Sequence, residues 1–388
     1  MGLISALGDS VEENRNSLQQ ARSGISPIRY YETAYAGKLP SAEVRHYTEE
    51  LNRKLFAKPD PSITRTSLLA LHAASQVIGD SGLTAAQLIS ADTGLVGATT
   101  VGGMCLTDEL YYDALAKEKG SPFLSSYDYA SVTMAIQKRY GIRGGTATIN
   151  TACSSSANAI IYGARLIRHG FARRAIVGGA ESLAKFTING FNALNILSSK
   201  PCAPFDRDRS GLNLGEGAAF LVLEKEEDLG GRKVYAELTG YGNKNDVYHP
   251  SSNSPEGLGP YLSMKDALEN SGLNARDIDY INAHGTGTEN NDETESRAML
   301  RLFEKMPPFS SIKSLTGHTL GAAGAMEAIY LILNLFHQEI YASLTFHHPI
   351  PETGLIPVPH FEKRTVRHVM SNSFGFGGNC STLIFSKT

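Results

Sequence analysis

The chain carries a weak internal repeat, and this repeat most constrains how it can fold. In the first half, Asp80–Ala85 follows an expected amphipathic helix and contains Gly82. In the second half, Asn270–Ala275 also follows an expected amphipathic helix and contains Gly272. The separation between Gly82 and Gly272 is close to half the length of the chain. A glycine at the end of a helix can adopt the left-handed conformation that caps it. We therefore expect two structurally similar halves.

Apolar strands follow each repeat in matching order. Residues 93–97 correspond to residues 278–282, and residues 174–179 correspond to residues 367–372. Strands that alternate with helices predict an α/β architecture with buried parallel or mixed strands. We predict one half over residues 1–228 and the other over residues 229–388, with the joint near Asp228–Gly231.

The composition excludes several classes of protein. The chain has 36 Lys+Arg against 39 Asp+Glu and no dense basic block, which argues against a nucleic-acid partner. The four cysteines are widely separated, as in a reducing compartment, and form no zinc-ligand pattern. Met1–Ser5 lacks the plan of a signal peptide. Glu327 and Asn334 interrupt the apolar stretch Leu320–Phe336, which predicts a buried helix and no membrane span. We expect a soluble, cytoplasmic protein.

Cys153 lies between a β-rich segment, Thr146–Asn150, and a helical pattern over Ala157–Ile167. At the start of a helix, the positive end of the dipole is expected to lower the thiol pKa and to favour a nucleophilic thiolate. The alternative is a small buried core residue, which is the common fate of a lone cysteine.

Two histidines lie in glycine-flanked segments. His284 follows an expected strand and opens the loop His284–Thr288, and His318 ends the segment Lys313–His318. A single histidine in such a place is more often structural. Two of them at expected strand ends, together with Cys153, favour a catalytic set. A further glycine-rich turn, Asn372–Asn379, offers backbone N–H groups for half of an oxyanion hole and lacks the lysine of a phosphate loop.

Taken together, these segments resemble the β-ketoacyl-acyl-carrier-protein synthases, specifically the elongating types I and II, over nearly the whole chain. The motifs that carry the resemblance are Thr151–Ser154, Gly178–Glu181, Leu214–Gly217, Asn282–Thr286, Lys313–His318 and Asn372–Gly378. The resemblance implies a thiolase-like fold with two duplicated halves in five layers, α-β-α-β-α. It also implies a homodimer, with the strand before Cys153 at the interface, and acyl carrier protein as partner. No cofactor or metal is implied, because the substrates travel on the phosphopantetheine of the carrier protein.

The resemblance further implies a role for each site residue. Cys153 would become an acyl-enzyme, the backbone N–H groups of Cys153 and Phe376 would hold the oxyanion, and His284 and His318 would donate hydrogen bonds to the enolate oxygen. Lys313 and Glu327 would supply electrostatics and positioning. The residues expected to contact the substrate are Thr286, Thr288 and Ser251 on the pantetheine arm, Val101 on the floor of the acyl pocket, and Phe191 and Phe374 as gate or pocket residues.

The chain departs from the family at three places. An apolar strand that relatives carry before the segment matching Met1–Leu3 is absent, and we expect its loss to leave a buried gap in the first sheet. Asn379–Cys380 replaces the usual Thr-Asn, which puts the hydrogen bonds of that loop in doubt. A position that is often basic in relatives is Asn195, so the docking surface for the carrier protein is expected to shift, with Arg65 and Arg209 as candidates for the remaining contacts.

Two alternatives remain open from the sequence. One is the partner subunit of a heterodimeric synthase, which binds carrier protein and sets chain length without condensing, and the intact Cys-His-His set argues against it. The other is a thiolase-like acyltransferase that uses coenzyme A, and His318 and the threonine loop count against that. Acyl chain length is not predicted.

Overall fold

The computed structural model describes residues 1–118 and 120–388, and its strands form two five-stranded sheets with the same pattern of neighbours. The first sheet contains, in order, β1 (Gly2–Ser5), β7 (Gly217–Glu224), β6 (Arg174–Glu181), β4 (Thr93–Ala98) and β5 (Thr146–Ile149). The second contains β8 (Glu237–Asn245), β14 (Asn379–Ser386), β13 (His368–Phe374), β9 (Tyr280–Asn282) and β10 (Phe309–Ser310). In each sheet the first two pairings are antiparallel and the last two are parallel. This identical order confirms the prediction of two duplicated α/β halves.

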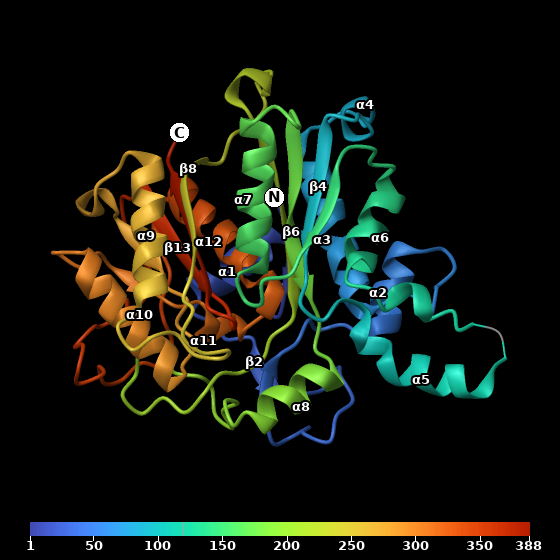
Figure 1. Cartoon of the computed structure of the whole chain (residues 1–388), viewed down its shortest axis with the longest axis horizontal. Helices are drawn as coiled ribbons and strands as arrows, with labels where there is room; N and C mark the ends of the chain where they lie inside the picture. The colour runs from blue at the N-terminus through green and yellow to red at the C-terminus, as the bar shows by residue number, and fades with distance from the viewer. Residues whose placement is uncertain (119) are drawn as a thin grey trace.

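Helices cover both faces of each sheet, which produces five layers (Figure 1). Between the two sheets lie α7 (Ser155–Arg168) and α12 (Ala323–His337). Outside the first sheet lie α3 (Arg65–Ser81) and α6 (Ala130–Tyr140), and outside the second lie α9 (Leu258–Ser271) and α10 (Glu289–Leu302). The other helices are α1 (Val11–Gln19), α2 (Thr48–Leu55), α4 (Ala85–Leu88), α5 (Thr107–Ala116), α8 (Lys185–Ala193) and α11 (Lys313–Thr316). Two short antiparallel strand pairs complete the fold, β2 (Ile25–Pro27) with β3 (Pro40–Ala42) and β11 (Glu339–Ile340) with β12 (Glu362–Lys363).

The helix ends that suggested the repeat are equivalent in the structure. α3 ends at Gly82 with φ +66°, and α9 ends at Gly272 with φ +71°. Both glycines take the left-handed conformation, so the expected caps are present in both halves.

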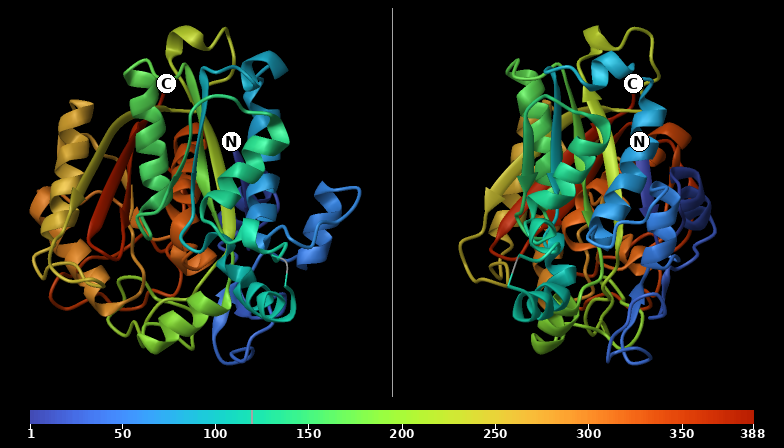
Figure 2. Two further views of the ribbon diagram at one scale, coloured as in Figure 1. Left: turned by 45° about the vertical axis from the view of Figure 1, so that its right-hand side comes forward. Right: turned by 90° about the vertical axis from the view of Figure 1, so that its right-hand side faces the viewer.

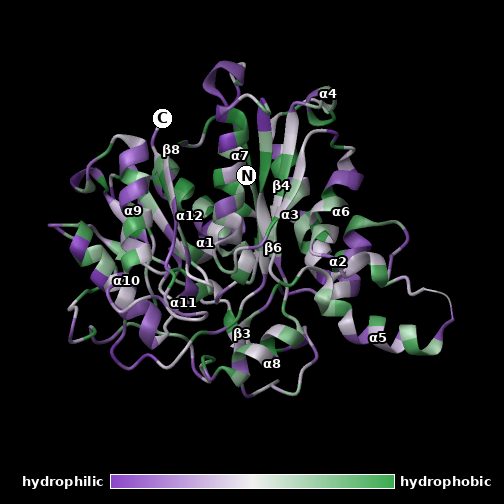
Figure 3. Ribbon diagram, in the orientation of Figure 1, coloured by the Kyte–Doolittle hydropathy of each residue, from purple (hydrophilic) through white to green (hydrophobic). Residues whose placement is uncertain are grey.

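The chain passes from the first sheet to the second between β7 and β8. This connection contains the short helix η3 (Glu226–Asp228) and two glycines with positive φ, Gly230 and Gly231. It is strongly polar and lies at the top of the molecule in Figure 3. The predicted joint at Asp228–Gly231 lies in this connection.

The expected gap in the first sheet is absent, so that prediction was wrong. Gly2–Ser5 itself forms β1 and pairs antiparallel with β7 at the edge of the sheet. Leu3 and Ile4 are buried there. The short edge strand fills the position because Ile4 packs against α3 on one face of the sheet, while Leu3 on the other face joins the core between the sheets.

The buried helix predicted at Leu320–Phe336 is confirmed. The window Leu320–His337 is long and apolar enough to cross a membrane by length and composition alone, yet 89% of it is buried inside the protein. It packs with α7 in the main hydrophobic core between the sheets (Figure 2). Its N-terminal end points at the loops that carry the candidate site.

Candidate active site

Cys153 lies on the turn between the edge strand β5 and the central helix α7. Ala152, directly before it, has φ +53°, a strained conformation for a residue with a side chain. Ser154 is the N-cap of α7, so Cys153 stands one residue before the N-cap, close to the predicted position.

His284 follows β9 by two residues, as predicted, and two buried carboxylates hold its loop. Glu295 accepts hydrogen bonds from the backbone N–H groups of His284 and Gly285, each 2.8 Å long. Asp292 accepts from the N–H groups of Thr286 and Gly287. Both acids belong to α10 and are fully buried, so this helix fixes the histidine loop.

His318 does not lie at a strand end, so this part of the prediction was wrong. The residues before it form the short helix α11, and Gly317 links that helix to His318. Its backbone is tied instead to the segment before β7, where its N–H donates to Asn213 O at 2.7 Å and its carbonyl accepts from Gly215.

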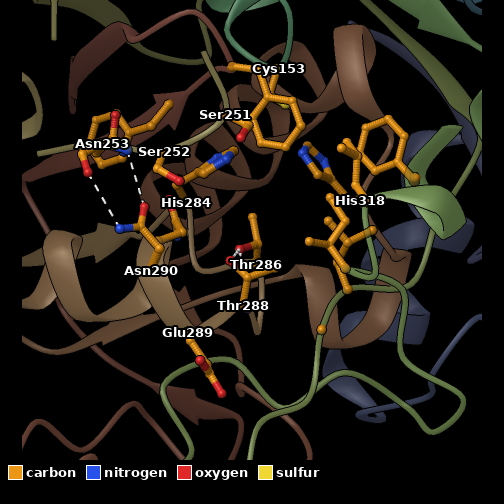
Figure 4. A pocket seen from close by; sticks show the side chains of 18 of the residues that line it. Cys153, Ser251, Ser252, Asn253, His284, Thr286, Thr288, Glu289, Asn290 and His318 are labelled. Atoms are coloured by element: carbon orange, nitrogen blue, oxygen red, sulfur yellow. Dashed lines mark hydrogen bonds between the residues drawn. The ribbon is translucent and has the colours of Figure 1, made fainter. Parts of the chain in front are cut away.

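These three side chains converge in space (Figure 4). The sulfur of Cys153 and one ring nitrogen from each of His284 and His318 lie within 4.8 Å of one another, and all three residues are buried. The two imidazole rings meet edge to face, with centroids 5.3 Å apart. Residues from both halves of the chain therefore form one constellation.

Both imidazoles are held neutral. Burial, the Lys313 ammonium and the neighbouring His318 lower the pKa of His284 well below its usual value of 6.5, and burial with Lys313 does the same to His318. The Nζ of Lys313 lies 3.3 Å from Nδ1 of His284, and the backbone N–H of Leu320 lies 3.3 Å from Nδ1 of His318. Each Nδ1 thus accepts a hydrogen bond, which places the ring proton on Nε2.

Lys313 and Glu327 form the buried pair that the resemblance implied. The Nζ of Lys313 donates to Glu327 Oε1 at 2.5 Å and to the carbonyl of His284 at 2.6 Å. Both side chains are almost fully buried. A buried charge of this kind is tolerated only when it is paired, so the pair delivers a positive charge beside the histidines.

The thiol pKa moves in the direction opposite to the one predicted. Burial raises the pKa of Cys153 to about 11, although the charge of Lys313 and hydrogen bonds from the backbone N–H groups of Phe376 and Cys153 oppose the rise. Loss of hydration therefore exceeds the combined effect of the lysine charge and these two hydrogen bonds. The same two N–H groups face the sulfur, where an oxyanion formed by attack on a carbonyl would lie.

A cavity of about 410 Å³ opens onto these atoms. Of the predicted residues, nine line it: Cys153, Phe191, Ser251, His284, Thr286, Thr288, His318, Phe374 and Phe376. The Thr286 and Thr288 hydroxyls are 2.8 Å apart, below the histidines in Figure 4. Phe191 stacks on Phe376 with ring centroids 5.9 Å apart, and Phe374 lies against His284.

Val101 is not among the residues that line this cavity. It is buried in the loop after β4, and its backbone N–H donates to Glu181 Oε1 at 3.0 Å. Lys313 and Glu327 also lie behind the cavity wall and act on it through His284.

The two arginines proposed for carrier-protein docking lie in different environments. Arg65 is buried and pairs with Glu216 through two hydrogen bonds of 2.9 and 2.5 Å, so it cannot contact a partner and that prediction was wrong. Arg209 is half-buried near the cavity mouth and donates to the carbonyls of Asp206, Thr288 and Glu289. Asn195 lines the mouth with φ +55°.

Asn379, which stands where relatives usually have threonine, belongs to a network of polar side chains. Its side-chain oxygen accepts from Ser154 Oγ at 2.7 Å, from Asn158 Nδ2 at 2.8 Å and from Asn243 Nδ2 at 3.0 Å. Asn379 thereby ties the glycine-rich turn to the nucleophile loop.

The sequence analysis did not identify Asp292 and Glu295 as site residues. Their three-residue spacing puts them on one side of α10. The only signal was their closeness to the histidine loop.

Cysteine and histidine, the two residue types at the site, are also ligands for zinc. A metal-bound histidine ordinarily donates its second ring N–H to an oxygen acceptor. Here the Nδ1 of His284 faces the Lys313 ammonium, and this positive charge opposes a divalent cation. The donor set fits an anion that forms during reaction better than a metal.

The fold and the site together define a thiolase-like protein in which a buried cysteine, two neutral histidines and two backbone N–H groups meet at one cavity. Two family models match the chain, the beta-ketoacyl synthase N-terminal domain over residues 1–229 and the C-terminal domain over residues 235–347. The chain belongs to the β-ketoacyl synthase family.

Individual relatives agree with this family. The chain is similar to 3-oxoacyl-[acyl-carrier-protein] synthase 2 of Vibrio cholerae, with 33% identity over 412 residues, covering 100% of this chain and 97% of the relative. Among solved structures it is similar to the ishigamide ketosynthase/chain length factor, with TM-score 0.93, 32% identity and coverage of 100% and 97%. A ketosynthase in complex with its chain length factor from Xenorhabdus doucetiae has TM-score 0.88, 32% identity and coverage of 100% and 96%.

Proposed function

We propose that the protein elongates acyl chains by decarboxylative condensation on acyl carrier protein. The observation that carries this proposal is the arrangement of Cys153, His284 and His318, whose reactive atoms lie within 4.8 Å of one another with both Nε2–H groups available as donors.

In the first step, the Cys153 thiolate attacks the carbonyl carbon of a carrier-bound thioester. The backbone N–H groups of Cys153 and Phe376 stabilise the tetrahedral oxyanion. The bond from the carbonyl carbon to the carrier sulfur then breaks, and the carrier thiol leaves with a proton equivalent to the one that Cys153 lost. An acyl-enzyme remains.

In the second step, malonyl-carrier protein loses carbon dioxide and its carbanion attacks the acyl-enzyme. Charge develops on the thioester oxygen of the malonyl group, and the Nε2–H groups of His284 and His318 donate to it. The new carbon–carbon bond forms as the Cys153 sulfur leaves. Donors held in place before reaction are worth about 3 kcal/mol each in comparable sites.

The remaining predicted residues receive supporting roles in this proposal. Thr286, Thr288 and Ser251 line the cavity that would admit the pantetheine arm. Phe191, Phe374 and Phe376 form its apolar wall, and Val101 lies behind it on the side expected to hold the acyl chain. Lys313 and Glu327 position His284 and do not transfer protons.

A second subunit is part of the proposal. β5 is an edge strand whose outer edge is unpaired within the described residues, and such edges are normally covered. Tyr129 and Met134, 40% and 56% exposed, lie beside a hollow next to this strand. Two similar solved structures are described as a ketosynthase with a chain length factor, which supports a second copy or a homologous subunit as the partner. We expect the protein to work in the cytoplasm, and all four cysteines are free thiols.

The test uses a panel of acyl-carrier-protein thioesters from short to long chain, with intact mass recorded for wild type and Cys153→Ala. We expect a mass gain of one acyl group in wild type only, and its discharge as a ketoacyl product on addition of malonyl-carrier protein. No adduct with any acyl group, with and without a homologous partner subunit, would exclude the condensing function. Equal transfer from acyl-coenzyme A and from the carrier protein would favour the coenzyme A-dependent alternative.

A further inference from the structure

Glu181 is a buried carboxylate with no assigned task in the mechanism above. It ends β6 and has no exposed surface. It accepts five hydrogen bonds, more than any neutral side chain could. Oε1 accepts from Thr99 Oγ1 at 2.9 Å and from Val101 N–H at 3.0 Å. Oε2 accepts from the Thr100 N–H at 2.7 Å, the Thr100 hydroxyl at 2.5 Å and the Gly321 N–H at 3.1 Å.

The bond to Gly321 connects this carboxylate to the turn that follows His318. A Cβ added to Gly321 would lie 2.8 Å from Glu181 Oε2 and 2.9 Å from the backbone nitrogen of Thr100. The turn therefore contacts the carboxylate and the β4 loop directly through its backbone.

Leu320, between His318 and Gly321, is held in a strained conformation. Its φ is +46°, in the left-handed region that costs a residue with a side chain about 1–2 kcal/mol. In this conformation its N–H lies 3.3 Å from Nδ1 of His318. Such strain persists only where surrounding contacts hold it, and the bond from Gly321 to Glu181 is the contact next to it.

The contact between Leu320 and His318 determines which ring nitrogen of His318 carries the proton. Because Nδ1 of His318 accepts from Leu320, its proton lies on Nε2, which is buried and has no partner among the described residues. One ring nitrogen of His318 lies in the cluster with Cys153 Sγ and His284, and Nδ1 already accepts from Leu320. Without the Leu320 contact, a neutral imidazole is free to carry its proton on Nδ1, and the Nε2 donor is then lost.

We propose that Glu181 is a positioning residue that holds the His318–Gly321 turn and thereby keeps Nε2–H of His318 pointed at the reacting oxygen. The inference rests on the proposed condensation, because it concerns the histidine that would stabilise the malonyl-derived enolate. Glu181 does not touch substrate in this arrangement.

Glu181→Gln tests the proposal with almost no change in volume. The amide nitrogen cannot accept hydrogen bonds, so in either orientation at least two of the five donors lose their acceptor. We expect malonyl-carrier decarboxylation to fall about tenfold to 100-fold in kcat with KM nearly unchanged, approaching the loss caused by removing a donor. Acylation of Cys153 by a short acyl-carrier thioester should change by less than about threefold, since it uses backbone donors.

A double-mutant cycle separates positioning from general damage. If Glu181 acts through His318, Glu181→Gln combined with His318→Ala loses no more decarboxylation than His318→Ala alone. Additive losses would overturn the inference. The matched control is Glu224→Gln, a buried carboxylate that faces Arg174 at the opposite end of the same strand pair. It should reduce stability and leave both half-reactions unchanged.

A spectroscopic measurement keeps the inference independent of activity. Nitrogen NMR of histidine-labelled protein should report the Nε2–H tautomer of His318 in wild type and in Glu224→Gln, and a mixture of tautomers in Glu181→Gln. An unchanged His318 signal would also overturn the inference. If wild type shows neither acylation nor decarboxylation, the proposed function fails while the tautomer still tests this point. If Glu181→Gln does not fold, Glu181→Asp, which keeps the charge but is one methylene too short to reach both segments, takes its place in each measurement.

Discussion

The ammonium of Lys313 lies 3.3 Å from Nδ1 of His284 and 2.5 Å from Oε1 of Glu327. A cation that donates to one ring nitrogen opposes protonation of the ring and leaves Nε2–H as the donor. The positive charge is available at the site only because Glu327 neutralises it in a buried setting.

This relationship predicts an unusual pH dependence of malonyl-carrier decarboxylation. The pKa of both histidines is lowered well below 6.5, so each stays neutral as the pH falls through that value and protonates only at lower pH. The rate measured from pH 8 to pH 5.5 should stay flat through 6.5. In Lys313→Met combined with Glu327→Gln, the acid limb should move to higher pH because the opposing charge is gone. A wild-type midpoint near 6.5 would contradict this account.

The two histidines should act in the second half-reaction and not in the first. His284→Ala and His318→Ala should each lower kcat for decarboxylation by about 10²–10³-fold, the usual effect of removing one donor to a developing oxyanion. Acyl-enzyme formation, followed by intact mass, should persist because its oxyanion is held by backbone N–H groups. His360→Ala, at an exposed position, is the control that should change neither step. Loss of acylation in either histidine variant would count against this division.

Cys153 should react slowly with alkylating reagents near neutral pH. With its pKa raised to about 11 by burial, only about one thiol in 10³ is ionised at pH 8, and alkylation by iodoacetamide should rise about tenfold per pH unit up to pH 10. Peptide mass mapping assigns the site, and Cys153→Ala is the blank. A rate that already levels off at pH 8 would show that the helix terminus dominates after all.

Arg65 should behave as a structural residue. Arg65→Ala leaves Glu216 as an unpaired buried carboxylate, which ordinarily costs about 3–5 kcal/mol of unfolding free energy. Denaturant unfolding should report this loss, while Arg207→Ala, an exposed residue in a surface pair, should change stability by less than about 1 kcal/mol. A raised KM for the carrier protein at unchanged stability would restore the docking role.

Local sequence patterns predicted the duplicated fold and part of the site. The position of His284 was predicted correctly because this residue follows an apolar strand. The repeat around Gly82 and Gly272 correctly predicted two duplicated halves. The setting of His318 was wrong because α11 is a single turn, too short to leave a helical period in the sequence.

Other features depend on contacts that no local pattern contains. The pKa of Cys153 was predicted in the wrong direction because its burial depends on the loop at Phe374–Phe376, far along the chain. Asp292 and Glu295 were missed because a charged helix usually faces solvent. Here both carboxylates instead satisfy buried backbone N–H groups of the histidine loop.

Glu339 predicts how the stability of the whole protein depends on acid. It is a fully buried carboxylate that accepts from Arg15 at 2.8 Å, Lys363 at 2.7 Å, Gln19 at 3.0 Å and Tyr341 at 2.9 Å, so it joins α1 to the end of α12. Burial alone would raise its pKa, but the bonds from Arg15, Lys363 and Gln19 outweigh it and lower the pKa to about 2 from 4.5. A depressed pKa stabilises the fold above the unfolded value, and this stabilisation is lost as the pH falls from about 4.5 towards 2.

Glu339→Gln should therefore lower the unfolding free energy by roughly 2–3 kcal/mol at pH 7, with the difference from wild type shrinking as the pH falls below 4.5. Urea unfolding at a series of pH values measures both quantities. Glu362→Gln, in an exposed surface pair on the adjoining strand, is the matched control and should follow wild type. A constant difference across this pH range would mean that Glu339 contributes through packing and not through its charge.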